Sequence, residues 1–373
     1  MMLEEHYDYL STRNRHRFFE RAVAATVRPG DVVADLGCGT GVLGLMCLRA
    51  GAARTYEIES GPIIEVARES FRRLGFLDRA VFLRGTSNRL VLPEKVDVLI
   101  CDHIGYFGID YGILGMIEDA RNRFLKPGGA IIPSKLRLLL APVTSRRAIA
   151  PVVKWRDRKI SQDYHWISEL AGHQKHAAKL DSTNLLSDPQ VVTTLDLHAD
   201  TAPTLVLEAR FEAERAGPLH GLAGWFEAEL APGVVMTNAP DGRSAIARPQ
   251  AFFPIDPPVD LEAGETVRAS LVIRPSEHSF NWDIRLPGRK LQIRRSTFDG
   301  ELLDPDWHRR ADPAYTPQAS PQALARRTVL GYCDGTRTRQ QIIDVVLKTH
   351  PDLMPSQEEL TAFVVQVIEC DTC

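Results

Sequence analysis

A glycine-rich turn and a carboxylate beyond it have the residue types and spacing of a nucleoside-binding site. The turn contains Gly37, Cys38, Gly39 and Gly41, and it follows the run 32–36, in which Asp35 lies two residues before the first glycine. Glycines let a ligand lie against the backbone, and Glu59, at the end of the next predicted strand, can accept hydrogen bonds from two ribose hydroxyls. The G-x-G-x-G spacing differs from most dinucleotide fingerprints, which are spaced G-x-G-x-x-G.

The elements needed to place these residues alternate along the first part of the chain. Strands are predicted at 32–36, 54–59, 81–83, 96–101 and 130–132, and helices at 14–26, 62–74 and about 112–124. The run 96–101 is almost entirely apolar, as expected for a parallel strand that is covered on both faces. Such alternation predicts a Rossmann-like, doubly wound parallel sheet.

The pattern changes after about residue 142. Alternating apolar and polar runs between 191 and 293, separated by Pro and Gly, predict antiparallel β structure, a β-barrel or a sandwich. Prolines then mark a linker, and two capping boxes, at 338–341 and 356–359, open apolar-periodic helices. We therefore expect four parts: 1–142, 143–298, a linker at 299–322, and a small helical domain at 323–373.

Composition narrows the class of protein. The 373 residues carry 45 Lys and Arg against 48 Asp and Glu, so no overall charge favours nucleic acid or a membrane surface. No apolar run reaches membrane-spanning length, and the first residues lack the features of a signal peptide. The six scattered cysteines favour a reducing, cytoplasmic setting, and the terminal Cys370-x-x-Cys373 lacks further ligands for a metal.

The glycine motif and the acidic strand end resemble those of class I methyltransferases that use S-adenosylmethionine. That resemblance implies a cofactor site, with Asn88 beside the adenine and Arg13 near the methionine carboxylate. It also implies that the cofactor residues include Asp35, Gly37, Cys38, Gly39, Gly41 and Glu59.

The loop 101–112 and the following 120–129 resemble the acidic loop of protein arginine methyltransferases. The segments 221–229 and 257–265 are similar to that family's barrel. The resemblance implies a Rossmann-like domain followed by a β-barrel, with a peptide or protein substrate held between them. It also implies a possible homodimer, with 165–180 as a shortened dimerisation arm.

This loop departs from the family at the residues that clamp a guanidinium. The family uses two glutamates, since a planar cation needs acceptors on two sides. Here the first position is Asp102 and the second is Tyr111, with Asp110 adjacent, and an Arg replaces part of a barrel motif near 246–248. We therefore expect an acceptor other than arginine. The candidate catalytic residues are Asp102, His103, Tyr106, Asp110 and Tyr111.

Residues 330–368 resemble the peptide chaperone of pyrroloquinoline quinone biosynthesis, a winged-helix family that includes elements recognising leader peptides. That likeness implies a substrate guided by its leader, and 291–298 could supply part of the strands that bind it. Three alternatives stay open. The helices could simply cover the barrel, the chain could be a true arginine methyltransferase with a degenerate acidic loop, or it could be a non-catalytic peptide scaffold.

Overall fold

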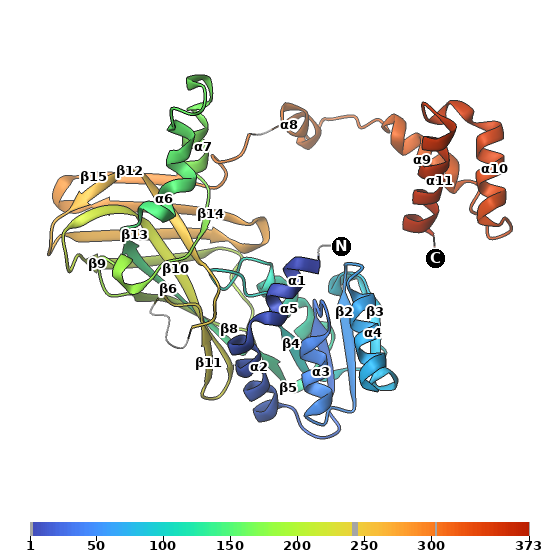
Figure 1. The fold of residues 1–373 in the computed structure, drawn as a ribbon, viewed down its shortest axis with the longest axis horizontal. Helices are drawn as coiled ribbons and strands as arrows, with labels where there is room; N and C mark the ends of the chain where they lie inside the picture. The colour runs from blue at the N-terminus through green and yellow to red at the C-terminus, as the bar shows by residue number, and fades with distance from the viewer. Residues whose placement is uncertain (1–2, 241–244, 303, 373) are drawn as a thin grey trace. The chain divides into compact units, whose positions relative to one another are not determined.

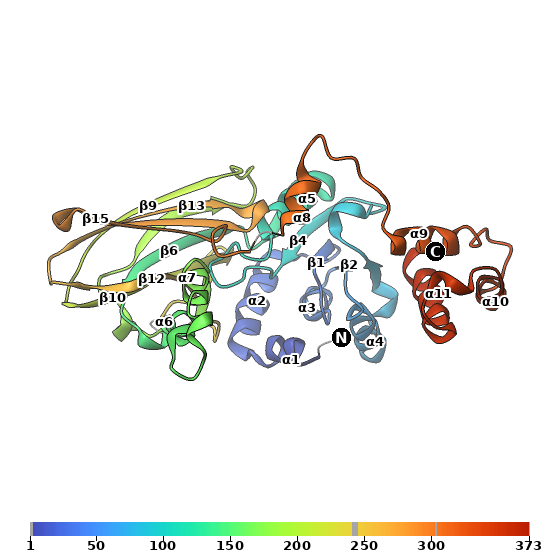
Figure 2. The same cartoon turned by 90° about the horizontal axis from the view of Figure 1, so that it is seen from above.

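The computed structural model describes residues 3–240, 245–302 and 304–372. By their internal contacts the residues form two compact units, Met1–Glu301 and Leu302–Cys373. Figure 1 shows the elements of each unit, and Figure 2 shows them from above. The two units are described separately.

Unit 1 begins with a five-stranded parallel sheet in the order β3-β2-β1-β4-β5. Its strands are β1 (Val32–Leu36), β2 (Arg54–Glu59), β3 (Ala80–Arg84), β4 (Val96–Cys101) and β5 (Leu125–Ile132). Its helices are α1 (Leu3–Ser11), α2 (Arg13–Thr26), α3 (Val42–Arg49), α4 (Ile64–Leu74) and α5 (Ile113–Arg123). The predicted Rossmann-like sheet is confirmed. Its strand order changes direction between β1 and β4, where ligands bind in open α/β sheets.

The rest of unit 1 consists of two antiparallel sheets. The first contains β6 (Lys135–Val143), β7 (His176–Ala178), β8 (Gln190–Asp196), β10 (Gly217–Ala231), β11 (Val234–Thr237) and β12 (Gln250–Leu261). The second contains β9 (Leu205–Glu212), β13 (Thr266–Arg274), β14 (Ser279–Leu286) and β15 (Leu291–Ser296). Strand pairing among the described residues joins these strands into two separate open sheets, so the predicted closed barrel is not observed. Alternation within a strand cannot reveal whether the outermost strands pair.

The antiparallel part begins earlier than the predicted boundary at 142. Strand β6 begins at Lys135 and pairs with β10 and β8, whereas β5 pairs with β4 in the parallel sheet. Strand β6 and the end of β5, at Ile131 and Ile132, are apolar and buried, and an apolar run does not tell which sheet a strand will join. The segment between β6 and β7 adds two short helices, α6 (Arg146–Val153) and α7 (Ile167–Gly172).

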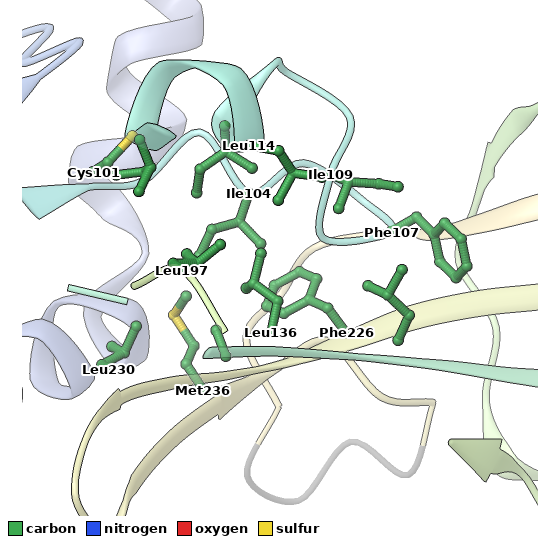
Figure 3. Close-up of a cluster of buried hydrophobic side chains, with 14 of the residues drawn as sticks. Cys101, Ile104, Phe107, Ile109, Leu114, Leu136, Leu197, Phe226, Leu230 and Met236 are labelled. Carbon is green, nitrogen blue, oxygen red and sulfur yellow. The ribbon is translucent and has the colours of Figure 1, made fainter. Parts of the chain in front are cut away.

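The loop after β4 is anchored on the first antiparallel sheet by apolar side chains. Ile104, Phe107 and Ile109 are buried in the same cluster as Leu136 and Phe226 of that sheet, as Figure 3 shows. Gly224 in β10 lets the loop approach the sheet, since a Cβ at this position would lie 2.6 Å from the Phe107 ring. This packing ties the loop to both the parallel and the antiparallel parts of unit 1.

Unit 2 contains helices α8 (Pro305–Ala311), α9 (Pro321–Leu330), α10 (Arg339–Thr349) and α11 (Gln357–Asp371). The last three bury a common core of Ala325, Val329, Ile342, Ile343, Val346, Leu360, Phe363, Val364 and Val367. Thr338 accepts from the Gln341 amide and Ser356 from the Glu359 amide. The capping box predicted at 338–341 is confirmed by the reciprocal bond from the Thr338 amide to the Gln341 side chain, whereas at 356–359 only the Ser356 cap is observed.

The strands expected of a winged helix are not found among residues 304–372. The segment proposed to supply them, 291–298, instead forms β15 and pairs with β14 in unit 1. Residues 299–322 are not a plain linker either, since α8 lies within them. Cys370 is exposed, and Cys373 lies outside the described residues. None of the described helices combines the length and apolar character that crossing a membrane requires.

Candidate functional site

Two recesses meet at the carboxyl ends of β1 and β4. Recess A, of about 310 Å³, extends past Glu59 to Asn88 and Met116. Recess B, of about 290 Å³, lies against α1 and α2 and is lined by Tyr9, Arg15, Cys38, Gly39, Asp102 and Tyr111, among others. Gly37, Glu59 and His103 line both recesses. One elongated ligand can therefore occupy both by lying across the glycine turn.

Glu59 is held at the junction by backbone amides. One carboxylate oxygen accepts the N–H of Gly61 at 2.7 Å and the other accepts the N–H of Gly39 at 3.2 Å. The oxygen that accepts from Gly61 also accepts the Ser60 hydroxyl at 3.4 Å. These bonds fix the carboxylate beside the turn, and the oxygen bonded to Gly39 keeps a further lone pair for a ligand. The position is the one expected of an acceptor for two adjacent hydroxyls.

Asp35 and Gly41 lie behind the turn and line neither recess. Asp35 is 1% exposed and accepts the Gly44 N–H at 3.0 Å, which secures the first turn of α3. Gly41 has φ +78°, and a Cβ there would lie 2.6 Å from the Phe71 ring. The structure thus places these two predicted cofactor residues in support of the turn.

A second carboxylate, Glu57 on β2, lies buried beside Asp35. Both oxygens of Glu57 and one of Asp35 lack a hydrogen-bond partner in the structure. Burial raises the pKa of Asp35 to about 7 and raises the pKa of Glu57 well above its usual range. The pair is therefore largely protonated at mildly acidic pH. Sequence analysis missed Glu57, although its place inside a buried parallel strand was a usable signal.

Asp102, the first residue of the acidic loop, is paired with a residue of α2. Its carboxylate forms an ion pair with Arg15, and the side chains are 7% and 5% exposed. A second guanidinium, from Arg248, lies 3.8 Å from the same oxygen. Its other oxygen has no partner in the structure. Asp102 therefore sits between two cations at the inner end of recess B.

Arg15 is a site residue that the sequence analysis did not select. The predicted residue, Arg13, stands two positions earlier on the same helix. It is exposed and is not among the residues that line the recesses. The buried residues of α2 are Arg15, Phe19, Ala22 and Val23, which share one helical face. That spacing was the available signal for Arg15.

Asp110 holds the loop together and lines neither recess A nor recess B. One carboxylate oxygen accepts the N–H groups of Tyr106 and Phe107 at 2.7 and 2.6 Å. The other oxygen forms an ion pair with Lys175, which lies between α7 and β7. Asp110 is thus committed on both oxygens. The alternative in which this residue replaces the second glutamate would require breaking these bonds.

His103 lies directly against the glycine turn. A Cβ on Gly37 would overlap its imidazole ring, so only glycine fits there. Burial lowers the pKa of His103, which is neutral at pH 7 as a result. Its Nδ1 lies 3.6 Å from the Cys101 sulfur. The ring can therefore donate or accept a hydrogen bond at the junction of the recesses.

A third recess, recess C, adjoins recess B through Tyr9, Arg15 and Tyr111. It measures about 220 Å³ and is also lined by Tyr106 and Arg248. The rings of Tyr106 and Tyr111 meet edge to face with centroids 6.1 Å apart. The segment 246–249 reaches this recess from the antiparallel part, so the departure noted there in the sequence lies at the site itself. Recess C offers tyrosine hydroxyls and two guanidinium groups to an incoming side chain.

Comparison with known proteins agrees with this architecture. Residues 137–287 match the family model of the arginine methyltransferase oligomerization subdomain, and residues 19–138 match that of ribosomal protein L11 methyltransferase. The first match starts two residues into β6, as the strand pairing would place it. The chain resembles protein arginine methyltransferases. The resemblance covers both the parallel and the antiparallel parts of unit 1.

Relatives and solved structures extend the likeness. A probable protein arginine N-methyltransferase 6.2 of Oryza sativa subsp. indica is 34% identical over 236 residues, or 61% of this chain. The chain spans 58% of that relative's length. The arginine N-methyltransferase PRMT10 of Oryza sativa subsp. japonica is 28% identical over 306 residues, covering 72% of this chain and 76% of its own.

Two structures share the fold. The PRMT1 enzyme-prozyme heterotetrameric complex of Trypanosoma brucei, with AdoHcy, contains a chain with a TM-score of 0.70 at 18% identity. Protein arginine methyltransferase 10 of Arabidopsis thaliana gives 0.68 at 22% identity. Each match covers 79% of this chain and 97% of the other. These likenesses show that unit 1 shares the fold of the arginine methyltransferases.

Proposed function

We propose that this protein transfers a methyl group from S-adenosylmethionine to a side chain of a peptide or protein. The observation that carries the proposal is the junction of recesses A and B at Gly37 and Glu59, beside the loop 101–112. A nucleoside site opens there onto a recess lined by polar side chains. The similarity of both parts of unit 1 to arginine methyltransferases supports the same conclusion.

The residues present suit the cofactor. Glu59 offers acceptors for ribose hydroxyls, and Asn88 in recess A offers an amide for the adenine. Arg15 lines recess B and binds Asp102 through Nε and Nη2, so Nη1 is the donor that it can offer to the cofactor's carboxylate. When bound, S-adenosylmethionine supplies an electrophilic methyl group on its sulfonium.

Arginine is the acceptor that the relatives favour, contrary to the expectation from the sequence. The two rice relatives are named as arginine N-methyltransferases. For a guanidinium acceptor, Asp102 would accept hydrogen bonds from the substrate, and its free oxygen is available for this. The second acceptor would come from a tyrosine hydroxyl in recess C rather than from a glutamate.

A second candidate is an acceptor without a guanidinium. The observation that favours it is the pairing of Asp102 with Arg15 and its closeness to Arg248, which places positive charge where a cationic substrate would enter. Asp110 adds no further negative charge to the recess, since Lys175 binds it. A neutral or anionic side chain would meet no repulsion there.

Methyl transfer to a panel of peptides decides between these candidates. Each peptide carries one Arg, Lys, His, Asn or Asp in the same neutral sequence, and fragmentation mass spectrometry locates the added methyl. Methylation of the Arg peptide alone would establish arginine as the acceptor. Methylation of another peptide, with the Arg peptide untouched, would establish the second candidate. Failure of calorimetry to detect cofactor binding would refute the proposed function itself.

Two variants link the result to the site. Asp102→Asn keeps the size of the side chain but removes its charge, so transfer to arginine should fall by about 10²-fold or more. Asp97→Asn is the matched control, because Asp97 lies on β4 outside the three recesses. Equal losses in both variants would show that the effect is structural.

We also propose that unit 1 forms a homodimer, as the oligomerization-subdomain match suggests. Light scattering of the purified protein at two concentrations measures its mass and tests this proposal. A dimer should have twice the mass of the chain, and deletion of α7, within the predicted arm, should reduce it to the mass of a monomer. The leader-binding role of residues 323–373 and a cytoplasmic location stay predictions. A guide role for these helices would have to use a helical surface, because they contain no described strand.

A further inference from the structure

The outer face of the second antiparallel sheet carries a row of arginines. Arg268 on β13 lies directly opposite Arg210 on β9 and Arg285 on β14. The next row contains Glu208, Ser270, Asp283 and Arg294 in register. We call the face formed by Arg210, Arg268, Arg285 and Arg294 the arginine face. Its four arginines are all exposed.

Packing of the sheet does not account for this row. The opposite face of β13 is buried through Val267, Ala269, Leu271 and Ile273, and this apolar face holds the sheet on the core. Like charges directly opposite one another destabilise a sheet. Three guanidinium groups side by side therefore cost stability, and an anionic partner would remove that cost.

The charges of the arginine face are only partly neutralised within the chain. Asp283 pairs with Arg285 at 2.9 Å and with Arg294 at 3.0 Å. Within the described parts of the chain, neither Arg210 nor Arg268 makes an ion pair with a carboxylate. Two guanidinium groups are thus free to bind an anion from outside.

The arginine face is hollowed, which gives a partner a place to lie. A hollow of about 470 Å³ is lined by Arg210, Arg268 and Arg285 together with Glu208 and Ser270. A neighbouring hollow of about 340 Å³ shares Ser270 and Asp283 with the first and continues to Arg294. The two together form a shallow polar groove across the strands.

We propose that this groove docks an acidic, extended segment of the protein substrate, outside the acceptor recess. Adjacent strands lie ~4.8 Å apart, so the three opposed arginines span ~10 Å. Carboxylates at alternate positions of an extended peptide lie ~7 Å apart, so two of them fit within that span. The proposal rests on the proposed function, because its partner is the protein substrate, but it does not depend on which side chain accepts the methyl group.

The composition of the groove favours a peptide over a nucleic acid. The hollow around Arg268 is lined by no aromatic side chain on which a base could stack. Glu208 and Asp283 lie within the same groove and would repel a continuous phosphate backbone. A peptide can meet such mixed charges, because it can place a carboxylate at one position and a hydroxyl or ammonium at the next.

Fluorescence anisotropy with the full-length protein tests the proposal. The probe is a labelled peptide of alternating Glu and Ser, compared with its Gln-for-Glu counterpart and with labelled oligouridylate. The acidic peptide should bind at low salt, lose affinity at about 0.5 M salt, and bind at least tenfold more tightly than the Gln peptide. Binding of the two peptides with equal affinity would overturn the proposal, as would tighter binding of the oligouridylate.

The central arginine and a matched control locate the site. Arg268→Glu should weaken binding of the acidic peptide at least tenfold. Arg274→Glu changes the same charge on the same strand outside both hollows, and should change affinity less than twofold. Arg268→Gln, which removes the opposed like charges, should melt no lower than the natural protein. If Arg268→Glu folds but binds the peptide as tightly as Arg274→Glu, the groove is not the docking site.

Discussion

Replacing Asp35 by asparagine should remove a pH-dependent loss of stability from unit 1. Asparagine keeps an oxygen that can accept the Gly44 N–H, so the turn at the start of α3 survives. The side chain no longer ionises, however. The change therefore isolates the cost of carrying a negative charge beside Glu57 in the interior.

The sign and size follow from the pKa of the buried group. Burial raises the pKa of Asp35 from 3.8 to about 7, so the folded state holds its proton where the unfolded chain has lost it. This proton-linked stability is complete below pH 3.8 and is lost as the pH rises through 7. Between pH 5 and pH 8 the natural protein should lose about 3 kcal/mol from this group.

Urea unfolding at several pH values, followed by tryptophan fluorescence, measures the effect. Four of the five tryptophans, at 155, 166, 225 and 282, lie in unit 1, so the signal reports mainly that unit. The difference in unfolding free energy between Asp35→Asn and the natural protein should grow by about 3 kcal/mol from pH 5 to pH 8. Comparing the two proteins at each pH cancels the contributions of other titrating groups.

Asp97→Asn serves as a control of opposite sign. Burial alone would raise the pKa of Asp97, but hydrogen bonds from Lys126 and the Val32 amide outweigh it and lower the pKa. The charged form of Asp97 thus stabilises the fold at pH values above the pKa of the unfolded chain. This stability is lost as the pH falls and the carboxylate takes up a proton. Asp97→Asn should therefore be less stable than the natural protein at pH 8. A constant difference for Asp35→Asn from pH 5 to pH 8 would refute the reasoning about the buried pair.

Three further predictions test the cofactor turn and unit 2. Glu59→Gln should weaken cofactor binding about tenfold or more, because charged acceptors make the stronger hydrogen bonds, whereas the exposed Glu65→Gln should leave calorimetric affinity unchanged. Gly37→Ala should lower the melting temperature of unit 1 more than Gly75→Ala. Both glycines have positive φ, +71° and +76°, but only a Cβ on Gly37 would overlap a neighbour, the His103 ring. Thr338→Ala should cost the three-helix core about 1 kcal/mol through the lost cap, seen as faster amide exchange in α10; unchanged exchange would contradict this.

The parallel sheet could be predicted because its signals are local. Buried parallel strands are continuous apolar runs, and the glycines after β1 stand at alternate positions, 37, 39 and 41, where the backbone has positive φ. The antiparallel strands were also predictable from alternation, but their closure into a barrel was not. Closure depends on whether distant edge strands pair, and alternation carries no information about that.

The site was predictable on the cofactor side and much less so on the acceptor side. Gly37, Gly39, Glu59 and Asn88 line the recesses, and their role in holding a cofactor stays a prediction. Arg13 lies on an exposed face of α2 and lines neither recess A nor recess B. Helical spacing from Phe19 would have selected Arg15.

The chain's own sequence determined the nucleoside site, since a strand, a glycine turn and an acidic strand end lie within 28 residues, 32–59. Only the tertiary structure decided the charge that an acceptor meets. Arg15 and Asp102 are 87 residues apart, and Asp110 and Lys175 are 65 apart. Burial strengthens the interaction within each pair, because opposite charges outside water are strongly coupled. The net charge of a recess then depends on which side chains converge there. No local sequence pattern predicts this net charge, because the paired residues are far apart in the chain.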